Sequence, residues 1–154
     1  MKIIIASDHR GYKAKELIKP LLKQLGHEYV DIGCDKDETI DYPDLAYSAA
    51  VSVSQGEADR AILICGTGIG MCITANKVKG IRAALCYDEL TAKISRQHND
   101  ANILCLSGDL LGDFLIQKIT EHWLESEFIA GRHARRVDKI KLIDQGATPK
   151  DFRQ

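Results

Sequence analysis

A cysteine followed by a glycine-rich turn is the strongest chemical feature of this sequence of 154 residues. Cys65 ends an apolar run typical of a buried strand, and Gly66-Thr67-Gly68-Ile69-Gly70 leads from it into a predicted helix. Glycines let a ligand approach the backbone, and the N–H groups at a helix start favour negative charge. The pattern predicts a thiolate base or nucleophile beside an anion-stabilising cradle. A tight turn around an inert, buried cysteine is the alternative.

The same turn partly matches the dinucleotide-binding motif, G-x-G-x-x-G with an acid about 20 residues later. Asp88 lies at a suitable distance from Gly66. However, the glycines run G-x-G-x-G, one residue short, and the turn follows the third predicted strand rather than the first. The spacing therefore argues against a dinucleotide cofactor.

Two segments contain a histidine beside another polar residue. Asp8-His9 follows the first predicted strand, where the pair can relay a proton or bind a sugar hydroxyl and phosphate; alternatively, Asp8 caps the first helix. His98-Asn99 follows a predicted helix, where a histidine often serves as a C-terminal cap. A metal site from Asp8, His9 and His98 has no supporting spacing such as H-x-x-x-H, so we expect no metal.

A basic cluster occupies residues 131–136. If the chain is helical from Arg132 on, Arg132 and Arg136 lie on one face, where their guanidinium groups would match phosphate oxygens. A solvated basic patch is the alternative. Nucleic acid is a weaker interpretation, because no aromatic platform accompanies the cluster and the formal net charge of the chain is −1.

Alternating strands and amphipathic helices must position these groups. Apolar runs predict strands at residues 2–6, 28–32, 60–65, 83–86 and 103–106. Helical patterns lie between and after them, the later ones at residues 70–77, 88–97, 111–125 and 135–144. We expect an α/β fold, a doubly wound sandwich with a five-stranded parallel sheet, forming one domain over residues 1–145 with a flexible tail at 146–154. Ligands of such folds bind at the carboxyl ends of the strands.

Composition excludes several classes of protein. The chain is 45% hydrophobic and 28% charged, which is ordinary for a globular domain. No apolar run approaches the ~18–20 residues that cross a bilayer, and the amino terminus does not resemble a signal peptide. Five cysteines without a C-x-x-C pair fit neither a disulfide framework nor a structural zinc site. We expect a cytoplasmic protein without a membrane partner.

Several segments taken together resemble one family, the type B ribose-5-phosphate isomerases with their galactose- and allose-6-phosphate relatives. The matching segments are Ser7–Gly11, Asp41–Pro43, Ile64–Gly70, Ala75–Lys77, Gly80–Ala83, Ser95–Asn102 and Gly131–His133. The resemblance implies a three-layer Rossmann-like fold, no cofactor, and a homodimer with active sites at the subunit interface. It also implies interconversion of D-ribose 5-phosphate and D-ribulose 5-phosphate, a step of the pentose phosphate pathway. A six-carbon aldose phosphate is the alternative substrate, and a noncatalytic sugar-phosphate sensor is a more distant possibility.

The resemblance further implies a role for each matching residue. Cys65 would be the base that moves a proton between carbons 1 and 2. The turn Gly66–Gly70, with the Thr67 hydroxyl, would hold the enediolate oxygens, and His98 would act in opening the furanose ring. The remaining residues would bind the substrate: Asp8 at the sugar, Asn99 near the reacting oxygens, and His9, Arg132 and Arg136 at the phosphate.

One position departs from the family pattern. Close relatives carry an arginine two residues after Ser107, as another phosphate contact, whereas this chain has Asp109. A carboxylate a few ångströms from the phosphate would cost on the order of several kcal/mol at an effective dielectric of ~20. Asp109 would therefore turn away, pair with Arg135 or Arg136, or mark a different substrate.

Overall fold

The computed structural model describes residues 1–35 and 38–152, and five parallel strands form the centre of this part of the chain. The strands are β1 (Lys2–Ser7), β2 (Glu28–Asp31), β3 (Arg60–Cys65), β4 (Ala83–Leu85) and β5 (Ile103–Ser107). Their order in the sheet is β2-β1-β3-β5-β4, and every pairing is parallel. The predicted five-stranded parallel sheet is confirmed.

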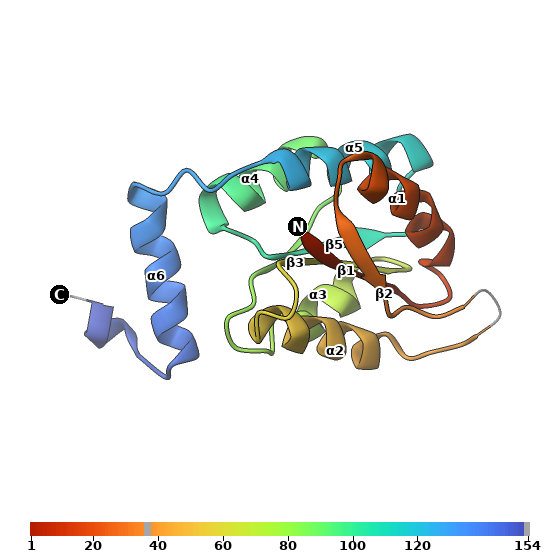
Figure 1. Ribbon diagram of the computed structural model, residues 1–154. Coiled ribbons are helices and arrows are strands. Elements are labelled where there is room, and N and C mark those ends of the chain that lie inside the picture. The colour runs from red at the N-terminus through yellow and green to blue at the C-terminus, as the bar shows by residue number, and fades with distance from the viewer. Residues whose placement is uncertain (36–37, 153–154) are drawn as a thin grey trace.

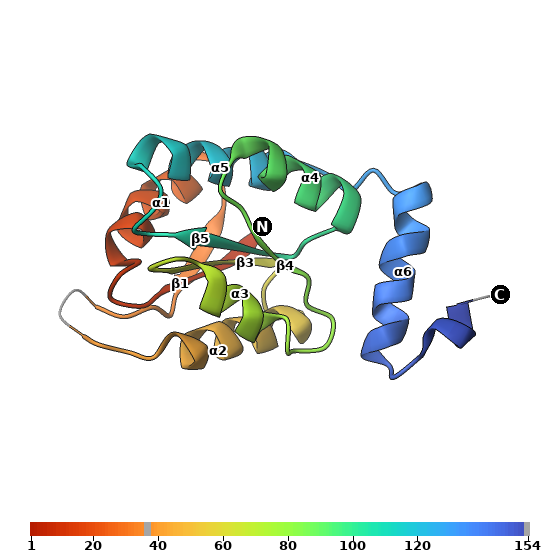
Figure 2. The same ribbon diagram turned by 180° about the vertical axis from the view of Figure 1, so that it is seen from behind.

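Helices cover both faces of this sheet. They are α1 (Tyr12–Gln24), α2 (Tyr42–Ser54), α3 (Ile69–Ala75), α4 (Glu89–Asn99), α5 (Asp113–Glu125) and α6 (Arg132–Asp144), followed by a short 3-10 turn at Pro149–Phe152. Helices α1, α4 and α5 lie on one face, and α2 and α3 lie on the other (Figures 1 and 2). Helix α6 stands apart from these layers, beyond the amino ends of the strands (Figure 1).

The sheet separates two apolar cores. Along β1, Ile3 and Ile5 face α1 and α5, while Ile4 and Ala6 face α2. Residues 61–65 of β3 are buried on both faces, which explains the continuous apolar run in the sequence. The chain leaves β1 toward β2 and then returns to β3 on the other side of β1, so the crevice at the carboxyl ends of β1 and β3 lies at the topological switch point.

Candidate active site

Cys65 ends β3 at the carboxyl edge of the sheet and lines a cavity of about 400 Å³. The lining residues are Asp8, Arg10, Tyr42, Cys65, Gly66, Thr67, Ile69, Gly70 and Ile73. Only 4% of the Cys65 surface is exposed, and the backbone N–H of Gly68 donates to its Sγ at 3.1 Å. A backbone donor aimed at the sulfur is the geometry that the predicted anion-stabilising cradle requires.

The turn after Cys65 is held by the end of β5. The carbonyl oxygen of Gly66 accepts from the hydroxyl of Ser107 at 2.6 Å and from the N–H of Asp109 at 3.1 Å. Gly68 adopts φ +77°, and a Cβ atom added there would lie 2.8 Å from the carbonyl oxygen of Leu106. Only glycine meets both demands, so this residue fixes the conformation of the turn.

The exposed half of the turn is ordered by two hydroxyl groups. The Thr67 side chain faces solvent at the cavity, and its Oγ1 accepts from the N–H of Ile69 at 3.3 Å. The hydroxyl of Tyr87 donates to the Thr67 carbonyl at 2.9 Å. Tyr42 packs on Gly70, where an added Cβ would lie 2.5 Å from its ring. Sequence reasoning assigned no role to Tyr42 or Tyr87, because neither contact follows from local spacing.

Asp8 orders the loop after β1. It is 6% exposed, and its Oδ1 accepts from the N–H groups of Arg10 at 2.9 Å and Gly11 at 3.0 Å. The cap position of α1 belongs to Gly11, so Asp8 forms a turn rather than the helix cap. Asp8 also lines the cavity, while its neighbour His9 is exposed to solvent. The contact of Asp8 with the sugar stays a prediction.

Asp109 forms an ion pair with Arg10, with Nη2 of Arg10 and Oδ2 of Asp109 2.5 Å apart. The predicted alternatives, pairing with Arg135 or Arg136, are therefore wrong. Those residues belong to α6, whereas Asp109 follows β5 at the carboxyl edge of the sheet. Arg10 lines the cavity and was missed by the sequence reasoning, although it lies inside the segment Ser7–Gly11.

The other predicted site residues lie at the opposite edge of the sheet. Helix α4 follows β4 and runs back toward the amino ends of the strands, so His98 and Asn99 are at that end (Figure 1). Helix α6 stands beside them and begins at Arg132, three residues before the predicted start, so Arg132 and Arg136 are both helical and lie one turn apart. The single chain thus divides the predicted residues into a cysteine group, Asp8, His9 and Cys65–Gly70, and a histidine group, His98, Asn99, Arg132 and Arg136.

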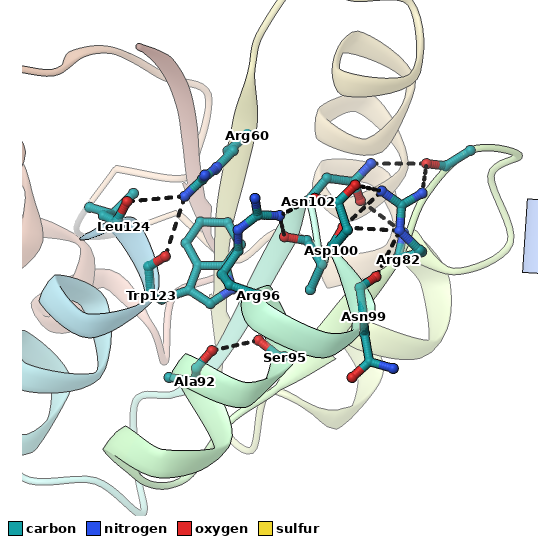
Figure 3. A network of polar contacts seen from close by, with 12 residues as sticks. Arg60, Arg82, Ala92, Ser95, Arg96, Asn99, Asp100, Asn102, Trp123 and Leu124 are labelled. Atoms are coloured by element: carbon teal, nitrogen blue, oxygen red, sulfur yellow. Dashed lines mark hydrogen bonds and ion pairs between the residues drawn. The ribbon is translucent and has the colours of Figure 1, made fainter. Parts of the chain in front are cut away.

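A polar network fixes the end of α4 (Figure 3). Arg82 donates through Nε to the carbonyl oxygens of Asn99 at 3.0 Å and Asp100 at 2.9 Å, and its Nη2 pairs with the Asp100 carboxylate at 2.9 Å. Nη1 of Arg96 binds the other Asp100 oxygen at 2.8 Å. Asp100 itself has φ +48°, which ends the helix. These contacts hold the backbone that carries His98 and Asn99.

The histidine group is rich in cationic side chains, and His133 of helix α6 lies against it. The rings of His98 and His133 are stacked, while Arg132 and Arg136 are exposed on the same helix as His133. Burial lowers the pKa of His133, and the neighbouring His98, Arg132 and Arg136 lower it further. The arrangement disfavours added positive charge and suits an anion.

Neither a metal cluster nor a membrane helix occurs in residues 1–35 and 38–152. There, no three His, Cys, Asp or Glu side chains are grouped so as to hold a metal ion. No helix in these ranges has the length and apolar character needed to cross a membrane.

Comparison with known proteins identifies the family. The Ribose/Galactose Isomerase family model matches residues 3–140. A putative sugar phosphate isomerase of Bacillus subtilis is 52% identical over 146 residues, which cover 94% of this chain and 98% of the relative. The structure of Clostridium thermocellum ribose-5-phosphate isomerase B superposes with a TM-score of 0.92 at 49% identity, covering 96% of this chain and 100% of that one.

A second solved structure carries a sugar phosphate. It is ribose-5-phosphate isomerase B of Mycoplasma genitalium with bound ribulose-5-phosphate, which superposes with a TM-score of 0.89 at 44% identity, covering 95% of this chain and 97% of that one. With the matching sheet and the thiol at its switch point, these likenesses confirm the resemblance seen in the sequence. This chain belongs to the ribose/galactose isomerase family, in its type B ribose-5-phosphate isomerase branch, and is a sugar-phosphate aldose–ketose isomerase.

Proposed function

We propose that this enzyme interconverts D-ribose 5-phosphate and D-ribulose 5-phosphate, with Cys65 as the base that carries a proton between carbons 1 and 2. The observation that carries the proposal is the position of the Cys65 sulfur, which lines the cavity and accepts the Gly68 N–H at 3.1 Å. The ribulose-5-phosphate bound to the Mycoplasma genitalium relative supports the choice of a pentose phosphate.

The chemistry needs a base and an anion cradle at one place. Removing a proton beside a carbonyl is difficult because the enediolate that results is unstable. A positioned base contributes about 10²–10⁴ in rate, and each donor to the developing oxyanion about 10²–10³. In this proposal Cys65 supplies the base, while the turn Gly66–Gly70 and the Thr67 hydroxyl bind the enediolate oxygens. The hydrogen moves as a proton, so the reaction requires no hydride acceptor.

A second copy of the chain completes the site in this proposal. Cys65 and the histidine group lie at opposite edges of the sheet, so one chain does not bring them together. In a homodimer, His98, Asn99, Arg132 and Arg136 of one copy would face Cys65 of the other. Large apolar side chains beside the cavity support such a contact, since Ile69 is 47% and Ile73 57% exposed. All five cysteines are free thiols, which fits the reducing cytoplasm.

Substitution of Cys65 tests the base. We expect Cys65→Ala and Cys65→Ser to lower kcat for ketose formation by at least about 10², because no other group replaces the thiolate. Cys105→Ala serves as the control, since this fully buried thiol belongs to the core below the site. Turnover near the wild-type rate in Cys65→Ala would remove Cys65 as the base. Comparing kcat/KM for five- and six-carbon aldose phosphates tests the substrate, and a preference for a six-carbon sugar would overturn the pentose assignment.

Mixed dimers test whether two chains share a site. A dimer of one Cys65→Ala chain and one His98→Asn chain contains one site with both residues intact if the site is shared between copies. Random mixing would then restore about a quarter of the wild-type activity, since half of the dimers are mixed and half of their sites are intact. If each site lay within one chain, every site would carry one substitution, and mixing would restore nothing.

A further inference from the structure

The cavity beside Cys65 contains one positively charged side chain among its described lining residues, and this is Arg10. We propose that Arg10 binds the phosphate of the substrate at the mouth of the cavity, and that Asp109 is its positioning residue. The proposal deepens the proposed function and rests on it, because it assigns the phosphate a contact from the same chain that supplies Cys65.

The ion pair of Arg10 and Asp109 lies directly over the turn that follows Cys65. A Cβ atom added to Gly66 would lie 2.7 Å from Oδ2 of Asp109 and 2.9 Å from Nε of Arg10. The pair therefore bridges the loop after β1 and the loop after β5 across the first residue of the cradle. The guanidinium therefore lies at the wall of the same cavity that Cys65 lines.

Both ends of the bridge are fixed through the backbone. The N–H of Arg10 donates to Asp8, and the N–H of Asp109 donates to the Gly66 carbonyl. The two loops also touch, since a Cβ atom added to Gly108 would lie 2.6 Å from the Arg10 carbonyl oxygen. Because neither loop has to move to place the guanidinium, its position costs little additional order when a ligand binds.

The guanidinium has donors to spare. Arginine carries five N–H donors in a planar fork, and Asp109 engages the Nη2 group. The Arg10 side chain is 61% exposed, compared with 33% for Asp109, so part of the fork faces solvent at the cavity mouth. A carboxylate on one edge weakens the net attraction for an anion but fixes the plane of the fork, which is what bidentate phosphate binding requires.

This pairing accounts for the departure at Asp109. An isolated carboxylate so near the phosphate would repel it. The ion pair with Arg10 neutralises the Asp109 carboxylate. Arg10, from the loop after β1, then supplies the cation that close relatives carry at position 109.

Kinetics with a phosphate probe test the proposal. We expect Arg10→Ala to raise KM for D-ribose 5-phosphate and the inhibition constant of inorganic phosphate together, by about 10- to 100-fold, with kcat changed less than about threefold. Arg10→Lys should recover only part of the loss, because an ammonium lacks the fork. Lys13→Ala, which removes an exposed cation from nearby α1, is the control for net charge and should change neither constant.

Asp109→Ala separates positioning from neutralisation. If Asp109 positions Arg10, the variant raises KM for D-ribose 5-phosphate and the inhibition constant of inorganic phosphate by about three- to tenfold, although a negative charge has been removed. If Asp109 only neutralises Arg10, both fall, and the positioning role is overturned. A pair that is merely structural would move the thermal midpoint and leave the phosphate inhibition constant unchanged.

Failure of this inference is distinguishable from failure of the proposed function. If the wild-type enzyme isomerises D-ribose 5-phosphate and Arg10→Ala leaves KM and the phosphate inhibition constant unchanged, the inference is wrong and the proposed function stands. If the wild-type enzyme does not turn this sugar over, the proposed function is wrong. Calorimetric titration of wild-type and Arg10→Ala protein with inorganic phosphate then decides the phosphate contact: loss of binding in the variant upholds it, and equal binding overturns it.

Discussion

The imidazole rings of His98 and His133 are stacked, with centroids 4.0 Å apart and planes 6° from parallel. His98 lies in the last turn of α4, and His133 lies in the first turn of α6 and is 7% exposed. The stack therefore joins α6, which stands apart from the other layers, to the body of the chain. Burial and a positive charge on the neighbouring His98 both oppose a proton on His133, so its pKa is lowered.

The stability of the fold should consequently depend on pH. The pKa of His133 is lowered in the folded protein by burial and by the charges around it, so the unfolded chain binds this proton first as pH falls. Stability present above the ordinary histidine pKa of about 6.5 is lost as pH falls below that value. Urea unfolding at pH 7.5, 6.5 and 5.5, at one protein concentration, should show the decline.

His133→Asn is the comparison that isolates this effect. The variant should lose stability less steeply between pH 7.5 and 5.5 than the wild type does. Some slope should remain, because burial also lowers the pKa of His27. An unchanged slope in His133→Asn would show that this histidine does not contribute.

The conformation of Gly68 makes a second prediction. An alanine there would adopt φ +77° and would press its Cβ against the Leu106 carbonyl at 2.8 Å. We expect Gly68→Ala to lower the free energy of unfolding by more than about 3 kcal/mol, because strain and clash add. It should also lower kcat/KM by at least about 10², since the Gly68 N–H would leave the Cys65 sulfur.

Gly56→Ala is the matched control for Gly68→Ala. Gly56 has φ +75°, but no atom outside its neighbours lies within 4 Å of an added Cβ. The Gly56→Ala variant should lose only about 1–2 kcal/mol in the free energy of unfolding, from conformational strain, without loss of kcat/KM. Equal effects of the two substitutions, measured by urea unfolding and initial rates, would contradict a special role for the turn.

The sequence predicted the sheet better than it predicted the start of α6. Strand β3 was located at residues 60–65 because burial on both faces leaves a continuous apolar run. Helix α6 begins three residues before the predicted Arg135, at Arg132. Its start is set by Ala130 and Gly131, which both have positive φ, at 57° and 55°. A backbone turn of this kind leaves no capping side chain for a sequence pattern to detect.

The site was predictable where one edge of the sheet collects its residues. Asp8 follows β1, and Cys65 ends the neighbouring parallel strand β3, so their meeting follows from the fold. The separation of His98 from Cys65 could also have been inferred, because a helix that follows a strand returns the chain to the opposite edge. The contact of Arg10 with Asp109 could not have been inferred from the sequence, since it depends on how two loops that are distant in the sequence pack together.

The network at the end of α4 makes the last prediction, because it links stability to the position of His98. Asp100 accepts from Arg82 and Arg96, whose side chains are only 14% and 8% exposed. Removing the carboxylate in Asp100→Ala leaves two poorly hydrated guanidinium groups without this partner, and alanine tolerates φ +48° less well than aspartate. We expect a loss of about 2–4 kcal/mol in the free energy of unfolding and a fall in kcat of about tenfold as His98 loses its fixed backbone.

Two further variants identify the cause of that loss. Asp100→Asn keeps a residue that tolerates the left-handed conformation but removes the charge, so a cost close to that of Asp100→Ala assigns the effect to the ion pairs rather than to strain. Asp138→Ala breaks a solvent-exposed pair with Lys141 on α6 and should cost less than about 0.5 kcal/mol, because water screens such pairs. If Asp100→Ala proves as stable and as active as Asp138→Ala in urea unfolding and steady-state assays, the network does not position His98.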